Sequence, residues 1–195
     1  MISSKHLVRK IGQAGFTALE LIVVLIVGVS IIAFAANKMA SVFGASAIAE
    51  ESDNVAVIMA GVRQINDAGS YLQANGAIPT PVQLQTTLIA ISAAPRAMVA
   101  TPATLRNRWG GAVTLAPAAN TYGISYAGVP VDDCIKLTNK VSMMTSVLAV
   151  TINGAAIGAV GAVPPTIPVP LAAAAAPGAC ANIAAGNVIV WTVKI

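Results

Sequence analysis

The chain has 195 residues, of which 56% are hydrophobic and 9% are charged. Ordinary soluble domains are about 25% charged, and this length leaves room for one modest globular domain. The formal net charge is +4, but Lys5, Arg9 and Lys10 lie in the first ten positions, so the rest of the chain is nearly neutral. Composition therefore gives no general reason to expect nucleic acid or an anionic surface as a partner.

A basic, hydrophilic leader (residues 1–15) is followed by an apolar segment, residues 16–36. At about 1.5 Å per helical residue, this segment spans roughly 31 Å, close to one hydrocarbon core of a bilayer. Glu20 is its single ionisable residue. A carboxylate at such a position costs a few kcal/mol and usually has a partner or a task, so Glu20 is a candidate functional residue.

The residues that join leader and apolar segment, Gly15-Phe16-Thr17-Ala18-Leu19-Glu20, resemble the prepilin peptidase site of type IV pilins and of type II secretion pseudopilins. In that family a peptidase cleaves after the glycine, and the new N-terminal residue is N-methylated. The resemblance implies cleavage after Gly15 and methylation of Phe16. It also implies that Glu20 neutralises the α-amino group of Phe16 on an adjacent subunit, and so sets the register of assembly.

Two other interpretations of the N-terminal region remain open at this point. A secretory signal peptide would be cleaved after the A-x-A-like run Ala33-Phe34-Ala35. A plain single-pass anchor would keep Met1 and would be oriented by the positive charges before the span. The first residue of the mature chain distinguishes them, because a pilin starts at Phe16, a signal-peptide product at Ala36 and an anchor at Met1.

The helix is expected to continue beyond the apolar segment, to about residue 72. Apolar side chains recur at steps of three and four residues, which is the period of one helical face, at Val55, Ile58, Val62, Ile65 and Leu72. Glu50, Glu51 and Asp53 occupy other positions. Glycines and prolines between Gly69 and Pro81 mark the end of this helix and a turn.

Residues 73–195 are expected to form a globular α+β head with an antiparallel sheet that packs on the second half of the helix. In chain order, the sequence predicts a short helix at 82–92, a loop at 95–102, a β-hairpin at 112–116 and 121–127, a helix at 134–145, a strand at 147–152 and a strand at 187–195. The Gly/Ala/Pro-rich stretch 154–178 argues against a continuous regular element.

Two cysteines, Cys134 and Cys180, both fall in the C-terminal half. In an exported domain they favour one disulfide, with a pair of buried free thiols as the alternative. The bridge would close a loop of about 46 residues, worth on the order of 4 kcal/mol in the chain-entropy model. It also resembles the bridge that bounds the C-terminal region of type IV pilins, here 134–180.

Further features resemble the type IV pilin fold and its b subclass. The segment Trp109-Gly110-Gly111 precedes a predicted strand, Cys134 lies on a predicted helix, and Cys180 lies near the last strand. Subclass b pilins commonly have Asn-Pro-Trp-Gly-Gly at this place. Here Arg108 stands where the proline would be.

Catalytic chemistry is not expected, and neither is a cofactor. The single histidine, His6, lies in the leader, so the mature chain would lack the side chain best suited to acid–base catalysis at neutral pH. Asp132 and Asp133 could be half of a cation site, although a cap for the helix that bears Cys134 explains them more simply.

One compact cluster combines positive charge with an aromatic side chain: Arg106, Arg108 and Trp109. Such a cluster could clamp single-stranded DNA. The alternative, which the nearly neutral domain favours, is a turn with Trp109 packed on the sheet. Nucleic acid is therefore not the expected partner.

The resemblance implies a structural subunit of a type IV pilus, and most simply the major pilin. Such a subunit is inserted in the inner membrane, processed by prepilin peptidase, and assembled with copies of itself into an extracellular filament. The pilus would serve adhesion, aggregation, motility or conjugative contact. Alternatives are a type II secretion pseudopilin, which often lacks the disulfide, and a minor pilin that acts as a tip adhesin or a DNA-binding module.

Overall fold

The computed structural model describes residues 18–73, 76–160 and 167–195. The chain divides into two compact units between Phe43 and Gly44. The second unit, residues 44–195, is called the head below. The predicted leader, residues 1–15, and the predicted first mature residue, Phe16, lie outside the described residues.

Helix α1 covers Ala18–Asp67 and stops earlier than the predicted end at residue 72. Gly69 adopts a positive φ of 68°, and the Ser70 N–H donates to the carbonyl of Ile65, which reverses the chain after the last turn. As a result Leu72 is 44% exposed, and its assignment to the buried helical face was wrong. Tyr71 is buried instead, and its hydroxyl donates to the carbonyl of Ala118 at 2.9 Å.

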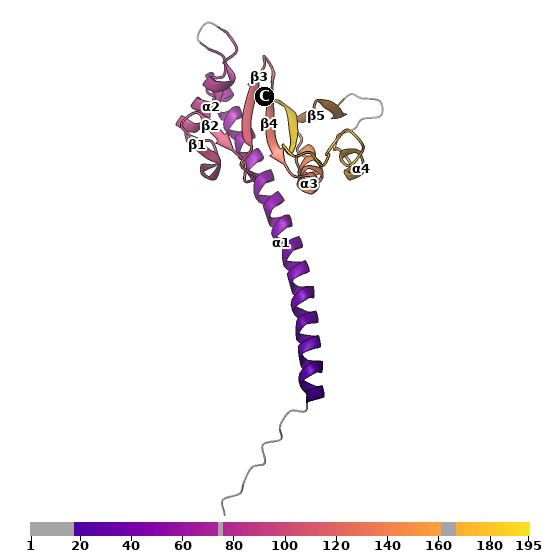
Figure 1. Ribbon diagram of the computed structural model, residues 1–195. Coiled ribbons are helices and arrows are strands. Elements are labelled where there is room, and N and C mark those ends of the chain that lie inside the picture. The colour runs from indigo at the N-terminus through magenta and orange to yellow at the C-terminus, as the bar shows by residue number, and fades with distance from the viewer. Residues whose placement is uncertain (1–17, 74–75, 161–166) are drawn as a thin grey trace, which may run out of the picture. The chain divides into compact units, whose positions relative to one another are not determined.

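The head consists of the second half of α1, short helices and a seven-stranded antiparallel sheet in the order β1-β2-β3-β4-β7-β5-β6 (Figure 1). After α1 the chain forms α2 (Pro81–Ala90), the 3-10 helix η1 (Arg96–Met98), β1 (Val99–Thr101), β2 (Thr104–Arg106), β3 (Ala112–Pro117), β4 (Thr121–Val129), α3 (Val131–Ser142), β5 (Val147–Ile152), β6 (Ala155–Ala159), α4 (Leu171–Ala174) and β7 (Asn187–Lys194). The α+β fold class is confirmed.

Most predicted elements are confirmed by this arrangement. The hairpin is β3–β4, and the two later predicted strands are β5 and β7. Helix α2 starts at a capping box, in which the Thr80 hydroxyl accepts from the Gln83 N–H and the Gln83 side chain accepts from the Thr80 N–H. The predicted loop 95–102 instead contains η1 and β1, and the stretch 154–178 contains the short elements β6 and α4 rather than one continuous element.

Helix α3 begins at Val131, before the predicted start at Cys134. Pro130 occupies the N-cap position with an extended backbone and makes no side-chain cap hydrogen bond. Asp132 and Asp133 therefore lie inside the first turn, so their assignment as a cap was wrong. Their negative charges are still favourable there, because the first turn of a helix carries a partial positive charge.

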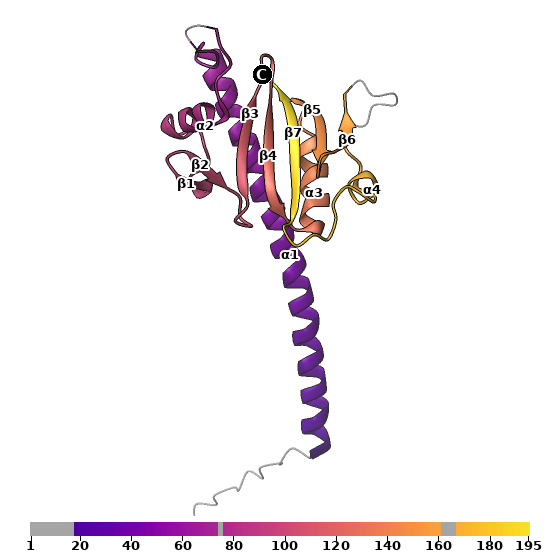
Figure 2. The same cartoon turned by 45° about the horizontal axis from the view of Figure 1, so that its top comes forward.

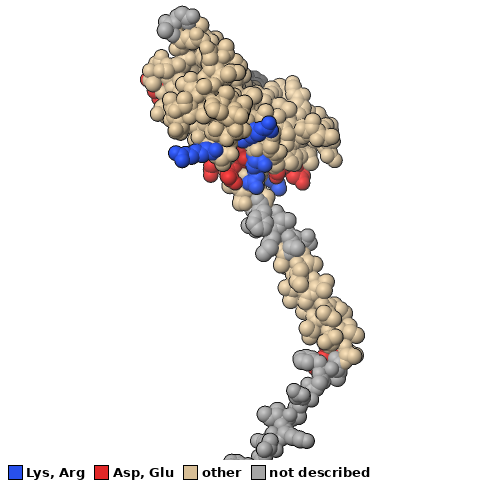
Figure 3. All heavy atoms as spheres, turned by 60° about the vertical axis from the view of Figure 1, so that its left-hand side comes forward, with Lys and Arg blue, Asp and Glu red and all other residues tan. Residues whose placement is uncertain are grey.

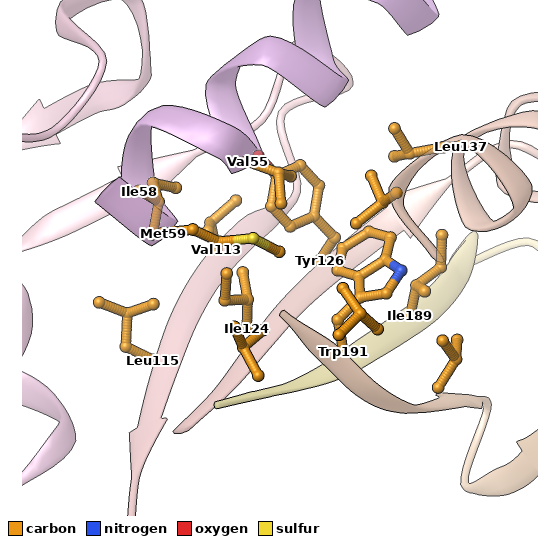
Figure 4. Close-up of a cluster of buried hydrophobic side chains, with 14 of the residues drawn as sticks. Val55, Ile58, Met59, Val113, Leu115, Ile124, Tyr126, Leu137, Ile189 and Trp191 are labelled. Atoms are coloured by element: carbon orange, nitrogen blue, oxygen red, sulfur yellow. The ribbon is translucent and has the colours of Figure 1, made fainter. Parts of the chain in front are cut away.

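The core lies between one face of the sheet and the second half of α1 and α3 (Figure 2), and Leu84 and Leu88 of α2 extend it beside β3. Burial alternates along β4 and β7, as expected for strands with one covered face. Tyr126 and Trp191 meet edge to face in the middle of this core, with ring centroids 5.4 Å apart. Figure 4 shows Val55 of α1 next to the Tyr126 ring, Ile58 of α1 on one side of the rings and Leu137 of α3 on the other.

Candidate assembly site and the disulfide-bounded region

The apolar part of α1, Ala18–Ala35, is exposed along its whole length in the isolated chain. Its large apolar side chains are 51% to 73% exposed, and its mean hydropathy is 2.8. By length and composition this segment could cross a membrane. A contiguous apolar surface of this size requires either lipid or other apolar helices around it.

Glu20 lies in the first turn of α1, at one end of this apolar segment, and is exposed. The structure thus places the predicted assembly residue on the surface that must be covered by lipid or by neighbouring helices. A carboxylate there favours a defined position along the helix axis, because burial away from a positive partner is costly.

The two cysteines are joined in a disulfide between α3 and the segment that follows α4. The Cα atoms of Cys134 and Cys180 are 5.9 Å apart, and both side chains are buried. The predicted pairing is confirmed. The bridge connects α3 to a segment with little regular structure, and so supplies a constraint that local secondary structure does not.

A buried amide reinforces the same region. Asn187, at the start of β7, is 1% exposed, and its Nδ2 donates to the carbonyls of Val129 and Ala181 at 3.0 and 2.9 Å. Its Oδ1 accepts from the Ala181 N–H and from Nδ2 of Asn153, at 2.8 and 2.9 Å. Asn187 therefore ties the residue after Cys180 to both β4 and the β5–β6 turn. Sequence reasoning missed this network, because an Asn at the start of a strand resembles any turn residue.

The segment Asn107-Arg108-Trp109-Gly110-Gly111 forms a turn that connects three parts of the head. Nδ2 of Asn107 donates to the carbonyl of Ala127 in β4 at 2.7 Å. Nε1 of Trp109 donates to Oδ2 of Asp133 in α3 at 3.0 Å. The third part is α1, whose Glu50 and Glu51 bind Arg108 of the turn. Trp109 packs against the core, as the turn interpretation predicted.

Two adjacent glutamates of α1 hold this turn in different ways. Glu50 forms an exposed ion pair with Arg108, with 3.2 Å between Oε2 and Nη1. Glu51 is 2% exposed, and its Oε1 accepts the backbone N–H of Arg108 at 2.9 Å. Burial raises the pKa of the Glu51 carboxyl, and the hydrogen bond from Arg108 opposes this only in part. The sequence pattern did not identify Glu51 as buried, although it lies one helical turn before Val55 and so continues the apolar strip.

Glycines allow the strand ends beside this turn to approach closely. A Cβ on Gly111 would overlap the carbonyl of Ala127, and a Cβ on Gly186 would overlap the backbone of Gly128. Gly128 and Gly186 also have positive φ angles, of 73° and 72°. In the Trp-Gly-Gly segment, close backbone packing thus requires Gly111, and a positive φ of 79° favours glycine at Gly110.

Charged side chains are unevenly distributed over the head. Figure 3 shows acidic and basic residues gathered in one region of the visible face, while most of that face is uncharged. In the sequence no charged residue occurs between Lys140 and Lys194, a stretch that includes most of the disulfide-bounded region. The arginines of the predicted cation–aromatic cluster are engaged, because Arg106 donates to the carbonyl of Gly110 at 2.8 Å and Arg108 pairs with Glu50.

These features agree with the similarities to known proteins. The family described as PilS N terminal matches residues 45–194, which is well over half of the chain. The chain belongs to the PilS family of pilins. No curated protein is similar enough in sequence to be matched.

Among solved structures, this PilS-family chain is similar to the crystal structure of type IV b pilin from Salmonella typhi. The sequences are 20% identical, the match covers 75% of this chain and 99% of that one, and the TM-score is 0.57. At this identity the likeness concerns the fold alone. The predicted membership of the type IV pilins is confirmed, and both similarities point to the b subclass.

Proposed function

We propose that this pilin is the major structural subunit of a type IV pilus and polymerises through the apolar part of α1. The observation that carries the proposal is the exposed apolar surface of Ala18–Ala35, attached to a head of the type IV pilin fold. A monomer cannot keep such a surface in water. Lipid before assembly and the helices of neighbouring copies after assembly are the two environments that would cover it.

Processing would prepare the subunit for this role. The prepilin peptidase would cleave after Gly15 and N-methylate Phe16, and the subunit would wait in the inner membrane until it is extracted into an extracellular filament. The disulfide-bearing head favours this role over that of a type II secretion pseudopilin. The filament would serve adhesion, aggregation, motility or conjugative contact.

Glu20 would align each new subunit with its neighbour. Inside a bundle of apolar helices, the Glu20 carboxylate and the Phe16 α-amino group each lose hydration, at a cost of several kcal/mol, and pairing offsets part of that cost. A helix that enters out of register leaves both charges unpaired. The pair therefore adds little net stability but discriminates strongly against wrong alignments.

The test compares Glu20→Ala with Val24→Ala, one helical turn further along the same exposed segment. Both variants should be cleaved and inserted like the wild type. Glu20→Ala should reduce the yield of sheared filaments about tenfold or more, since unpaired charges cost several kcal/mol, whereas Val24→Ala should keep most of the yield. A normal filament yield from Glu20→Ala would refute the assigned role.

A further inference from the structure

Two opposite charges near the end of α1 lack partners within the head. Arg63 and Asp67 lie one helical turn apart, and both residues are exposed. Neither side chain forms an ion pair or a hydrogen bond with the part of the chain that the structure describes. Their order is also unfavourable for pairing within one helix, because an acid four residues before a base pairs better than the reverse. Both charges are therefore available to a neighbouring molecule.

Asp67 is poorly placed in the isolated chain. It is the last residue of α1, and the last turn of this helix contains no basic residue. The C-terminal end of a helix carries a partial negative charge, so a carboxylate there is unfavourable unless a cation lies nearby. A cation from another molecule would relieve this repulsion.

Arg63 lies at a cavity of about 240 Å³ between α1 and the turn that joins α3 to β5. Ala56 and Ala60 of α1 line it, and Thr145 and Ser146 of the turn lie across from them. The N–H groups of these two turn residues make no hydrogen bond with the described part of the chain, and no acid is among the described residues that line the cavity. A guanidinium and spare donors without a competing carboxylate favour an anionic group.

The spacing of the two charges points to a second copy of this chain as the source of that group. Arg63 precedes Asp67 by four residues, so a parallel copy displaced by one helical turn, about 6 Å, brings the Asp67 of one copy level with the Arg63 of the other. The predicted assembly pair has the same order and spacing, because the positive α-amino group of Phe16 precedes Glu20 by four residues. Both pairs therefore require the same offset between neighbours.

We propose that Arg63 and Asp67 form an ion pair between neighbouring copies in the filament, with the Asp67 carboxylate of one copy seated at the Arg63 cavity of the next. Each copy gives one acid and receives another, so the contact is heterologous and can repeat without closing, as a filament requires. The inference rests on the proposed polymerisation and adds a contact between heads to it.

Charge reversal with co-expression tests the pair. Arg63→Asp places two acids on one chain and Asp67→Arg places two bases, so each variant alone brings like charges together between copies. Each should lower the yield of sheared filaments about tenfold or more, although near-ultraviolet circular dichroism should show a folded head. Co-expression should restore most of the yield, in filaments that contain both variants in similar amounts, because each acidic chain then has basic neighbours.

Asp53→Arg is the matched control. It reverses an exposed charge on the same helix, and the positions four residues away on either side, Ala49 and Val57, are uncharged. Its filament yield should equal that of the wild type. A loss as large as that from Asp67→Arg would show that any charge reversal on this part of α1 blocks assembly, and would overturn the specific pairing.

Two other results would contradict the inference. One is a normal filament yield from either Arg63→Asp or Asp67→Arg alone. The other is that co-expression fails to rescue assembly, because a pair within one chain is like-charged in both variants and cannot be restored by mixing. Filaments that need Glu20 but neither of these charges would refute this inference and leave the proposed function intact, whereas wild-type filaments that lack this chain would refute both.

Discussion

Replacement of Asn187 by alanine tests the account of the disulfide-bounded region. The native side chain is almost completely buried and takes part in four hydrogen bonds, to Val129, to Asn153 and twice to Ala181. Alanine removes all four and leaves the buried carbonyl of Val129 without this donor. The segment after Cys180 also loses its attachment to the sheet, although the disulfide itself stays intact.

The expected cost follows from these bonds. A hydrogen bond in a folded protein contributes about 1 kcal/mol net, and a cavity that residues 181–187 line lets water replace part of the loss. Asn187→Ala should therefore lower the free energy of unfolding by about 3 kcal/mol, a large fraction of the 5–15 kcal/mol typical of a domain. Urea unfolding of the detergent-solubilised chain, followed by near-ultraviolet circular dichroism, measures this difference.

Asn182→Ala is the matched control, because Asn182 belongs to the same segment and is exposed. Its effect should remain within about 0.5 kcal/mol, as for most surface substitutions. If the two variants destabilised the head equally, or if Asn187→Ala cost less than about 1 kcal/mol, the network would not be what holds this segment in place.

Two further predictions concern the disulfide and the buried glutamate. The Cys134–Cys180 bond closes a loop with a separation of 46 residues, so its reduction should lower the free energy of unfolding by about 4 kcal/mol. Amide hydrogen exchange should then rise first within residues 135–179. A uniform rise over the whole head would contradict this prediction. Because burial raises the pKa of Glu51 above its ordinary value of 4.5, the folded head loses stability progressively as the pH rises from 4.5 through the folded-state pKa. Glu51→Gln keeps an acceptor for the Arg108 N–H, so it should be more stable than the wild type in thermal unfolding at pH 7, and this advantage should vanish as the pH falls below 4.5. A variant less stable at pH 7 would show that the carboxylate gains more from its hydrogen bond than it loses by burial.

The parts of the fold that could be predicted from the sequence are those with a strong local pattern. Val147–Ile152 and Asn187–Ile195 are rich in β-branched residues, so their strands were identified almost to the residue. By contrast, β2 and β6 are short, and β6 consists mainly of alanine and glycine. Such segments become strands because a neighbouring strand pairs with them, and a single sequence carries no sign of that pairing.

Errors at element ends also have local causes. The apolar period runs on to Leu72, but the left-handed conformation at Gly69 reverses the chain first and brings Tyr71 into the core. At the start of α3, Pro130 takes the cap position that the following aspartates were expected to fill. In both cases a residue with special backbone preferences outweighed the pattern of side chains around it.

The features of the candidate site also divide into those that the sequence predicts and those that it does not. The disulfide was predictable from two cysteines in an exported domain, and Glu20 from its place in an apolar run. The burial of Glu51 and the bond from Trp109 to Asp133 were not, because they arise where three elements distant in sequence meet at one turn. The signal available for Glu51 was its place one helical turn before Val55, in line with the apolar strip.

Mass spectrometry of filaments sheared from the cell surface tests the central claim most directly. The account predicts that this chain is the main component, that it begins at an N-methylated Phe16, and that it carries the Cys134–Cys180 disulfide. Material that begins at Ala36 or at Met1, or surface filaments that lack this chain, would contradict it.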